Sequence, residues 1–105
     1  MTGTSKLTLF LTGDAPRSRR ARMNLQETLA SLGLEIGDVT EIDLLKNAQA
    51  ALDYGIFATP ALMIKPEGGD SIVMYGDLSE TTKLHEFIGQ LGSLDSMGSY
   101  NGKID

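Results

Sequence analysis

The clearest pattern of hydrophobic positions lies close to the start of the chain. Leu7, Leu9 and Leu11 alternate there with Thr8 and Phe10, and successive side chains of a β-strand point to opposite faces of a sheet. The pattern therefore predicts a strand with apolar residues on both faces. Such a strand belongs in the middle of a sheet, so we expect helices to cover both of its sides.

A helical repeat follows after a short turn. Its apolar residues recur every three or four positions: Ala21, Leu25, Leu29 and Leu32. Pro16 suits the first turn of a helix, where its missing N–H costs no hydrogen bond, and Asp14 or Ala15 is the expected cap. Gly33 supplies the stop. The pattern predicts a helix of about 16–18 residues.

Residues 39–45 predict a second strand, which the turn residues Gly37 and Asp38 precede. Strand, helix and strand together form a β-α-β unit, which is right-handed in nearly all proteins. A short Ala-rich helix comes next, with Asn47 as its expected cap and Gly55 as its end. Its narrow apolar side is expected to consist of Ala48, Ala51 and Leu52.

Two further apolar runs, residues 61–64 and 71–75, predict a pair of strands. The segment Pro66–Asp70 between them has the composition of a hairpin turn, since its glycines accept positive φ without strain. A last helix is expected to follow Ser79 as its cap. Its buried stripe is predicted to consist of Leu84, Phe87, Ile88 and Leu91.

The predicted order of elements is therefore βαβαββα, an α/β fold built on a central mixed sheet. We expect a single domain at residues 1–92. Residues 93–105 are rich in Gly and Ser and have no periodicity, so we expect a flexible C-terminal tail there.

Composition excludes several classes of function. The chain has no cysteine, which removes disulfides, thiolate metal sites and thiol nucleophiles and fits a reducing cytoplasm. The N-terminus has no apolar core of the length that a signal peptide needs, and no run approaches the roughly 20 apolar residues of a membrane span. We expect a cytoplasmic protein that neither crosses nor binds a membrane.

Charge is distributed unevenly along the chain. The net charge is −5, yet basic residues outnumber acidic ones in the first third, and four of them fall within six positions: Arg17, Arg19, Arg20 and Arg22. Cations in the first turns of a helix oppose its macrodipole, so a solvated face explains their polarity but not their position. A nucleic-acid binder requires basic residues spread over a face. The cluster therefore predicts contact with an acidic surface of a protein partner.

Pro60 stands where the short helix gives way to the third strand. Proline cannot donate to a sheet ladder, so it suits the first position of a strand. The tripeptide Ala58-Thr59-Pro60 resembles the proline of the thioredoxin fold, which is usually cis and lies beside the site where partners dock. The resemblance implies a cis bond here, and a prolyl bond can also act as a slow switch.

Four blocks of sequence together resemble the KaiB family of bacterial clock proteins, in the family's order and at close to its spacing. The blocks are Leu9–Gly13 followed by Pro16 and Ser18, Ile42–Asn47, Ala58–Leu62 and Gly76–Ser79. The resemblance covers roughly residues 6–91. It implies a thioredoxin-like βαβαββα domain and leaves open whether this chain serves a full three-component clock or a reduced timer.

The same resemblance implies a function without catalysis and without a cofactor. Members bind the hexameric ATPase KaiC and modulate its phosphorylation cycle, and in full clocks they capture KaiA and displace output histidine kinases. They adopt two folds. One is a tetrameric ground state, and the other is a monomeric, thioredoxin-like state that binds KaiC. Pro60, Gly76 and Asp77 are the expected fold-switch residues, and the arginine cluster is the expected partner-binding site. The local pattern of residues 61–91 favours the thioredoxin-like form.

Three alternatives remain beside this interpretation. A sensor module related to that of the SasA kinase has the same fold. A thioredoxin-type oxidoreductase would need a thiolate at the first helix, where this chain has none. A glutathione-binding protein could use Ser18 to orient the thiol of glutathione. Glutathione transferases, however, have a second, all-helical domain, which we do not expect in this chain.

Two further kinds of side chain could suggest chemistry. His85 is the only histidine and is expected to lie on the surface rather than to bind a metal. Asp43 and Asp77 are expected to serve as turn and capping residues, not as a catalytic pair.

Overall fold

The computed structural model describes residues 7–34, 39–65 and 69–89. The turn predicted at Gly37 and Asp38, the first part of the turn at Pro66–Asp70, Leu91 and the predicted tail at residues 93–105 lie outside the described residues.

The described elements occur in the order βαβαββα. They are β1 (Leu7–Leu11), α1 (Pro16–Ser31), β2 (Val39–Asp43), α2 (Gln49–Tyr54), β3 (Ala61–Ile64), β4 (Ile72–Tyr75) and a last helix at residues 81–89. The predicted order is therefore confirmed. Strand β4 begins one residue later than predicted.

The strands form one mixed sheet with the order β2-β1-β3-β4. β1 is parallel to β2, with Leu7 opposite Val39, and antiparallel to β3, with Leu7 opposite Ile64. β3 and β4 are antiparallel, as expected of a hairpin. The prediction that the first strand lies inside the sheet is confirmed, and β2 and β4 form its two edges.

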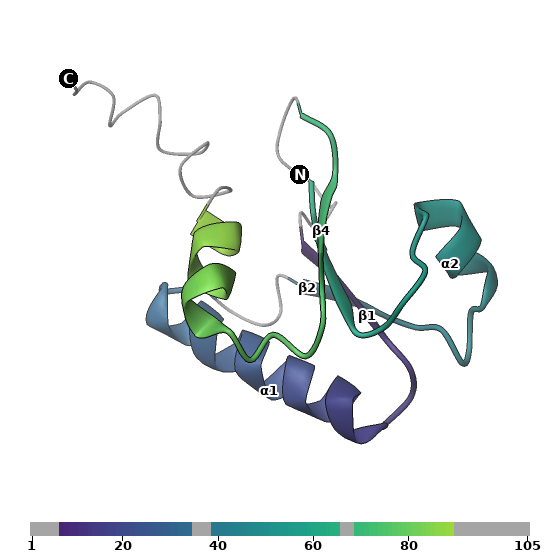
Figure 1. The fold of residues 1–105 in the computed structure, drawn as a ribbon, viewed down its shortest axis with the longest axis horizontal. Helices are drawn as coiled ribbons and strands as arrows, with labels where there is room; N and C mark the ends of the chain where they lie inside the picture. The colour runs from purple at the N-terminus through teal and green to yellow at the C-terminus, as the bar shows by residue number, and fades with distance from the viewer. Residues whose placement is uncertain (1–6, 35–38, 66–68, 90–105) are drawn as a thin grey trace.

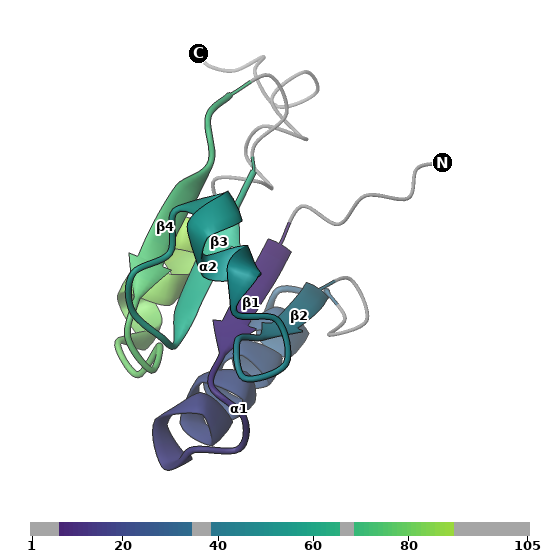
Figure 2. The same ribbon diagram turned by 90° about the vertical axis from the view of Figure 1, so that its right-hand side faces the viewer.

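Helices cover both faces of this sheet, as the sequence predicts. α1 and the last helix lie on one face, and α2 lies on the other (Figure 1). Figure 2 shows α2 in front of the strands with α1 behind them. We call these the α1 face and the α2 face.

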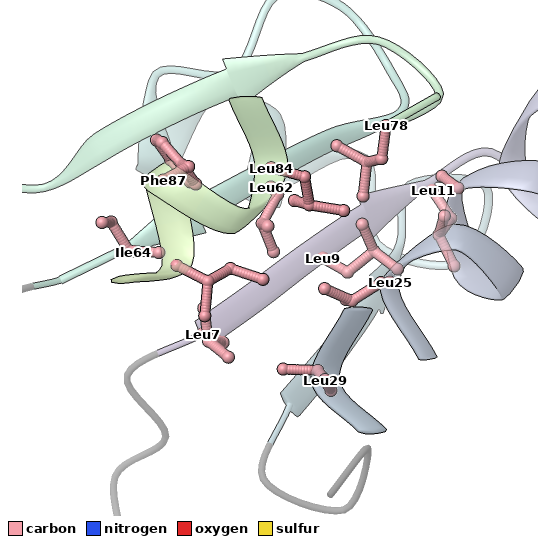
Figure 3. Close-up of a cluster of buried hydrophobic side chains, with 12 residues drawn as sticks. Leu7, Leu9, Leu11, Leu25, Leu29, Leu62, Ile64, Leu78, Leu84 and Phe87 are labelled. Carbon is pink, nitrogen blue, oxygen red and sulfur yellow. The ribbon is translucent and has the colours of Figure 1, made fainter. Parts of the chain in front are cut away.

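The α1 face holds the larger part of the core (Figure 3). Its buried apolar residues come from β1, α1, β3, the loop after β4 and the last helix: Leu7, Leu9, Leu11, Ala21, Leu25, Leu29, Leu62, Ile64, Leu78, Leu84, Phe87 and Ile88. The α2 face buries fewer: Phe10, Ile56, Ala61 and Met63. Phe10 thus points away from the leucines beside it, as strand alternation requires.

Both ends of α1 follow the predicted chemistry. Pro16 occupies the first helical position after Ala15, which caps the helix without a side-chain hydrogen bond. Gly33 follows the helix with a φ of 76°. Leu32 was expected in the buried stripe, but it is 42% exposed because it falls beyond the last helical turn.

Three predictions about the ends of elements after α1 are wrong. β2 ends at Asp43, so Leu44 and Leu45 belong to a turn. Asn47 does not cap α2, because Ala48 precedes the helix and makes no side-chain cap bond. Ser79 does not cap the last helix, which begins at residue 81; the first helical bond there runs from the N–H of Leu84 to the carbonyl of Glu80.

The apolar side predicted for α2 is also wrong. Ala50 is its buried residue, whereas Leu52 is 77% exposed. The helix has only six residues and follows a turn, so tertiary packing rather than periodicity decides which side faces the sheet.

Candidate functional site

Three arginines of the predicted cluster make ion pairs within the chain. Nη1 of Arg19 lies 3.5 Å from a carboxylate oxygen of Asp14 and also donates to the backbone carbonyl of that residue. Nε of Arg20 donates to Oδ2 of Asp77 at 3.1 Å. The Asp14 pair lies at the surface, with more than half of each side chain exposed, and such a pair contributes about 0–1 kcal/mol to stability.

Arg22 is held most firmly of the three. Its Nε and Nη2 donate to the two carboxylate oxygens of Glu41 at 3.0 and 3.1 Å, so the pair is bidentate. This hydrogen bonding raises the pKa of Arg22 above its ordinary value. Since Glu41 lies on β2, the pair joins α1 to an edge strand of the sheet.

Arg17 differs from its neighbours. Its side chain makes no hydrogen bond or ion pair with any described residue, and α1 has no acidic residue in its first turn. Arg17 instead lines a hollow of about 440 Å³ between the start of α1, the end of β4 and the start of the last helix. Tyr75, Ser79 and Lys83 are among the other lining residues.

Two of the three predicted switch residues, Gly76 and Asp77, line this hollow, and the third, Pro60, contacts Gly76. The Thr59–Pro60 bond is cis, as the resemblance implies, and the carbonyl of Pro60 accepts the N–H of Gly76 at 2.9 Å. Gly76 has a φ of 117°, which side chains other than hydrogen disfavour. The contact ties the chain after β4 to the chain before β3.

Asp77 organises the loop after this contact. Its Oδ1 accepts the N–H of Ser79 at 3.1 Å, and its Oδ2 accepts Nε of Arg20. Hydrogen bonds from Ser79 and Arg20 lower the pKa of Asp77 below its ordinary value of 3.8. Leu78 follows in a left-handed conformation with a φ of 64°, and its side chain is buried in the α1-face core.

Asp43 plays the matching part at the opposite edge of the sheet, where it ends β2. Its Oδ1 accepts the N–H groups of Gly13 and Leu45, each at 2.9 Å. These two bonds lower the pKa of Asp43 below its ordinary value of 3.8, and the bond from Gly13 has the larger effect. Gly13 has a φ of 54° and leads from β1 into α1. The prediction that Asp43 and Asp77 serve turns is confirmed, whereas neither of them caps a helix.

Ser18, the candidate glutathione ligand, makes its hydrogen bond within the fold. Its side chain is buried, and its Oγ accepts the N–H of Thr12 at 3.0 Å. The hydroxyls of Thr12 and Thr59 also bond to each other, which links the end of β1 to the residue before Pro60. This junction is structural.

His85 is only half-buried and contacts Ser31 across the two helices of the α1 face. Its Nε2 lies 2.9 Å from Oγ of Ser31, whose hydroxyl donates to the carbonyl of Thr28. Nε2 is therefore the donor. Among residues 7–34, 39–65 and 69–89, no group of three or more His, Cys, Asp or Glu residues is placed to hold a metal ion.

The α2 face carries large apolar side chains that lie open to solvent. Phe57 is 85% exposed and Leu52 is 77% exposed, with Tyr54 and Tyr75 at 49% and 37%. The Phe57 ring packs on Tyr75 at a centroid distance of 4.8 Å, and Tyr54 packs on the buried Phe10 at 5.3 Å. We call these four exposed residues the α2 surface.

The sequence interpretation did not identify this surface. Leu52 was assigned to the buried side of the helix, and Phe57 belongs to no periodic pattern. Phe57 lies in the connection between Gly55 and Pro60, but its neighbour Ile56 in the same connection is buried, so the local sequence holds no signal that separates the two.

No helix in the part of the chain that the structure describes is both long and apolar enough to span a membrane.

No protein-family model matches the chain. The circadian clock oscillator protein KaiB of Trichodesmium erythraeum (strain IMS101) is 38% identical to it over 79 residues, which is 74% of this chain and 74% of that protein.

Solved structures of the thioredoxin type are similar in fold. The N-terminal domain of SasA from Synechococcus elongatus has a TM-score of 0.64 and 22% identity, covering 93% of this chain and 87% of that domain. Thioredoxin from Fasciola hepatica has a TM-score of 0.62 and 20% identity, covering 80% of this chain and 77% of that one. At these identities the likeness concerns the fold alone. The thioredoxin-like prediction is therefore confirmed.

Proposed function

The chain belongs to the KaiB family, and we propose that it is a non-enzymatic timing regulator that binds the ring of a KaiC-type hexameric ATPase and modulates its phosphorylation cycle. Its relation to a named clock oscillator protein supports the role in timing. The lack of any cysteine and the burial of Ser18 support the absence of catalysis, because no candidate nucleophile is left at the start of α1.

The observation that carries the proposal is the α2 surface. Exposed aromatic and aliphatic side chains that gather on one face are typical of protein-protein interfaces, and Phe57 is the most exposed large apolar residue among those described. Burying it against a partner would remove apolar area from water without refolding the domain. We therefore place the main contact with the ring on Leu52, Phe57 and Tyr75.

The arginines divide into two roles in this proposal. Arg20 and Arg22 hold the Asp77 loop and β2 in place. Arg17 and Arg19 extend from the first turn of α1, and we propose that they supply the electrostatic part of partner binding. The contribution of these charges should fall as salt rises.

We also propose that the form described here is monomeric and cytoplasmic, and that it competes for the ring with a histidine kinase of the SasA type or captures a KaiA-type protein. The switch to a tetrameric form would involve Pro60, Gly76 and Asp77.

Co-sedimentation with the KaiC-type ATPase of the same organism, in ATP and in ADP, tests the proposal. We expect a complex in at least one nucleotide state and no turnover by this chain alone. The double variant Leu52→Ser, Phe57→Ser should weaken the complex at least about tenfold, since aromatic anchors carry much of an interface's binding energy.

Met23→Ser is the matched control, because Met23 is 58% exposed on α1, away from the α2 face. It should bind like the unmodified chain. A folded chain that binds the ring in neither nucleotide would refute the proposed partner. Equal loss in the control and the double variant would refute the proposed surface.

A further inference from the structure

The hollow beside Arg17 has a mainly polar lining and reaches Tyr75 on the edge strand β4. It lies between the first turn of α1, the end of β4 and the start of the last helix, with a volume of about 440 Å³. Tyr75 lines it and at the same time packs on the exposed ring of Phe57. Tyr75 is thus shared by the hollow and the aromatic part of the α2 surface.

The charges around the hollow leave one cation uncompensated. Asp77 is neutralised by Arg20 and by the N–H of Ser79. Lys83 pairs with Glu80 at 3.1 Å. Arg17 makes no ion pair with a described residue, so it is the group in the lining that still requires an anion.

Two backbone features add to this positive potential. The first turn of α1 contains no acidic side chain, and its cap residue Ala15 offers no side-chain acceptor to the helix N–H groups. The last helix also starts at the hollow, through Glu80 and Lys83. The N-terminal ends of both helices carry partial positive charge, which favours an anion beside Arg17.

We propose that this hollow binds the carboxylate side chain of an acidic segment of a protein partner, and that an apolar residue adjacent to the carboxylate packs on Phe57 and Tyr75. Arg17 forms the ion pair, because it carries the one uncompensated charge among the described lining residues. A single carboxylate matches a single free cation, and a dianion would be repelled more strongly by Asp77 and Glu80 in the same lining.

The proposal rests on the chain having a protein partner, as proposed above, but not on that partner being an ATPase ring. It is therefore tested without the ring. The probes are two blocked peptides, N-acetyl-Gly-Phe-Glu-Gly-amide and the same peptide with Gln in place of Glu, titrated into the full chain labelled with ¹⁵N and followed by NMR.

We expect the Glu peptide to bind about threefold or more tightly than the Gln peptide, which is the order of one partly exposed ion pair. The shifted amides should include those of Arg17, Tyr75 and Ser79. Arg17→Gln should remove the difference between the peptides. Lys65→Gln is the matched control, since Lys65 is an exposed cation after β3 that does not line the hollow, and it should preserve the difference.

Phe57→Ser should weaken both peptides equally, because it removes the apolar seat and not the charge. Equal affinity of the unmodified chain for the two peptides, or no shift with either, would overturn the proposal. So would a preference for Glu that survives Arg17→Gln. Inorganic phosphate that binds as tightly as the Glu peptide would assign an unselective anion site instead.

Discussion

The two faces of the sheet are covered to very different depths. On the α1 face, a helix of 16 residues and the last helix enclose twelve buried side chains from five segments of the chain. On the α2 face, a helix of six residues contributes one buried residue, and the core there has four. The α1 face therefore supplies most of the hydrophobic stabilisation, while the α2 face leaves apolar area in water.

This difference separates stability from recognition within one small domain. A side chain that is already packed cannot meet a partner without unfolding something, whereas Phe57 and Leu52 can. The charged groups follow the same division: Arg20 and Arg22 hold elements of the fold together, and Arg17 faces an open hollow. Substitutions on the two faces should therefore have opposite consequences.

The largest effect is expected from Leu25→Ala on the α1 face. Leu25 is fully buried in the centre of that core, and removing a buried leucine side chain costs about 2–5 kcal/mol through lost transfer energy and the cavity left behind. Urea unfolding followed by circular dichroism measures the loss. Met23→Ala, two positions earlier and 58% exposed, should leave the unfolding free energy within about 0.5 kcal/mol.

A smaller effect is expected at Gly76, whose N–H ties the chain after β4 to the chain before β3. The φ of 117° disfavours any side chain, although no atom lies within 4 Å of the position a Cβ would take. Gly76→Ala should therefore cost about 1–2 kcal/mol from backbone strain alone. Gly89→Ala is the control, because Gly89 has ordinary φ and equal space. An unchanged unfolding midpoint in Gly76→Ala would show that the loop relaxes.

The two loop carboxylates should make stability depend on pH in the acid range. The pKa values of Asp43 and Asp77 are lowered from 3.8 in the folded chain, so the unfolded chain binds protons first. Their contribution is complete above pH 3.8 and is lost as the pH falls through the lower folded values. The midpoint of urea unfolding should drop on acidification, and it should drop less steeply in the double variant Asp43→Asn, Asp77→Asn than in the unmodified chain. If the midpoints of the two proteins fell in parallel with pH, other titrating groups would control the acid dependence of stability.

The smallest effect on stability is expected at the α2 surface. Leu52→Ser and Phe57→Ser should each change the unfolding free energy by no more than about 0.5–1 kcal/mol, because both side chains are already in water. The same variants should lose partner binding. A large loss of stability in Phe57→Ser would mean that its packing on Tyr75 contributes to the fold, and the division between the faces would then fail.

The sequence by itself determined the order of the elements, the central place of β1 and the main contents of the α1 face. These features depend on period and on local chemistry. Leu7, Leu9 and Leu11 alternate, and the stripe from Ala21 to Leu29 repeats at helical spacing, so each segment indicates its own structure and buried side. The turn roles of Asp43 and Asp77 were predictable for the same reason.

Only the tertiary structure decided what α2 and the arginines do. A six-residue helix has too few positions for a period to indicate its buried side, so Leu52 was assigned inward although it lies in water. Charge runs likewise do not specify partners. Arg20 meets Asp77 and Arg22 meets Glu41 across 57 and 19 positions of sequence. Which arginine stays unpaired depends on which carboxylates the folded chain brings within reach, and local sequence does not encode that distance.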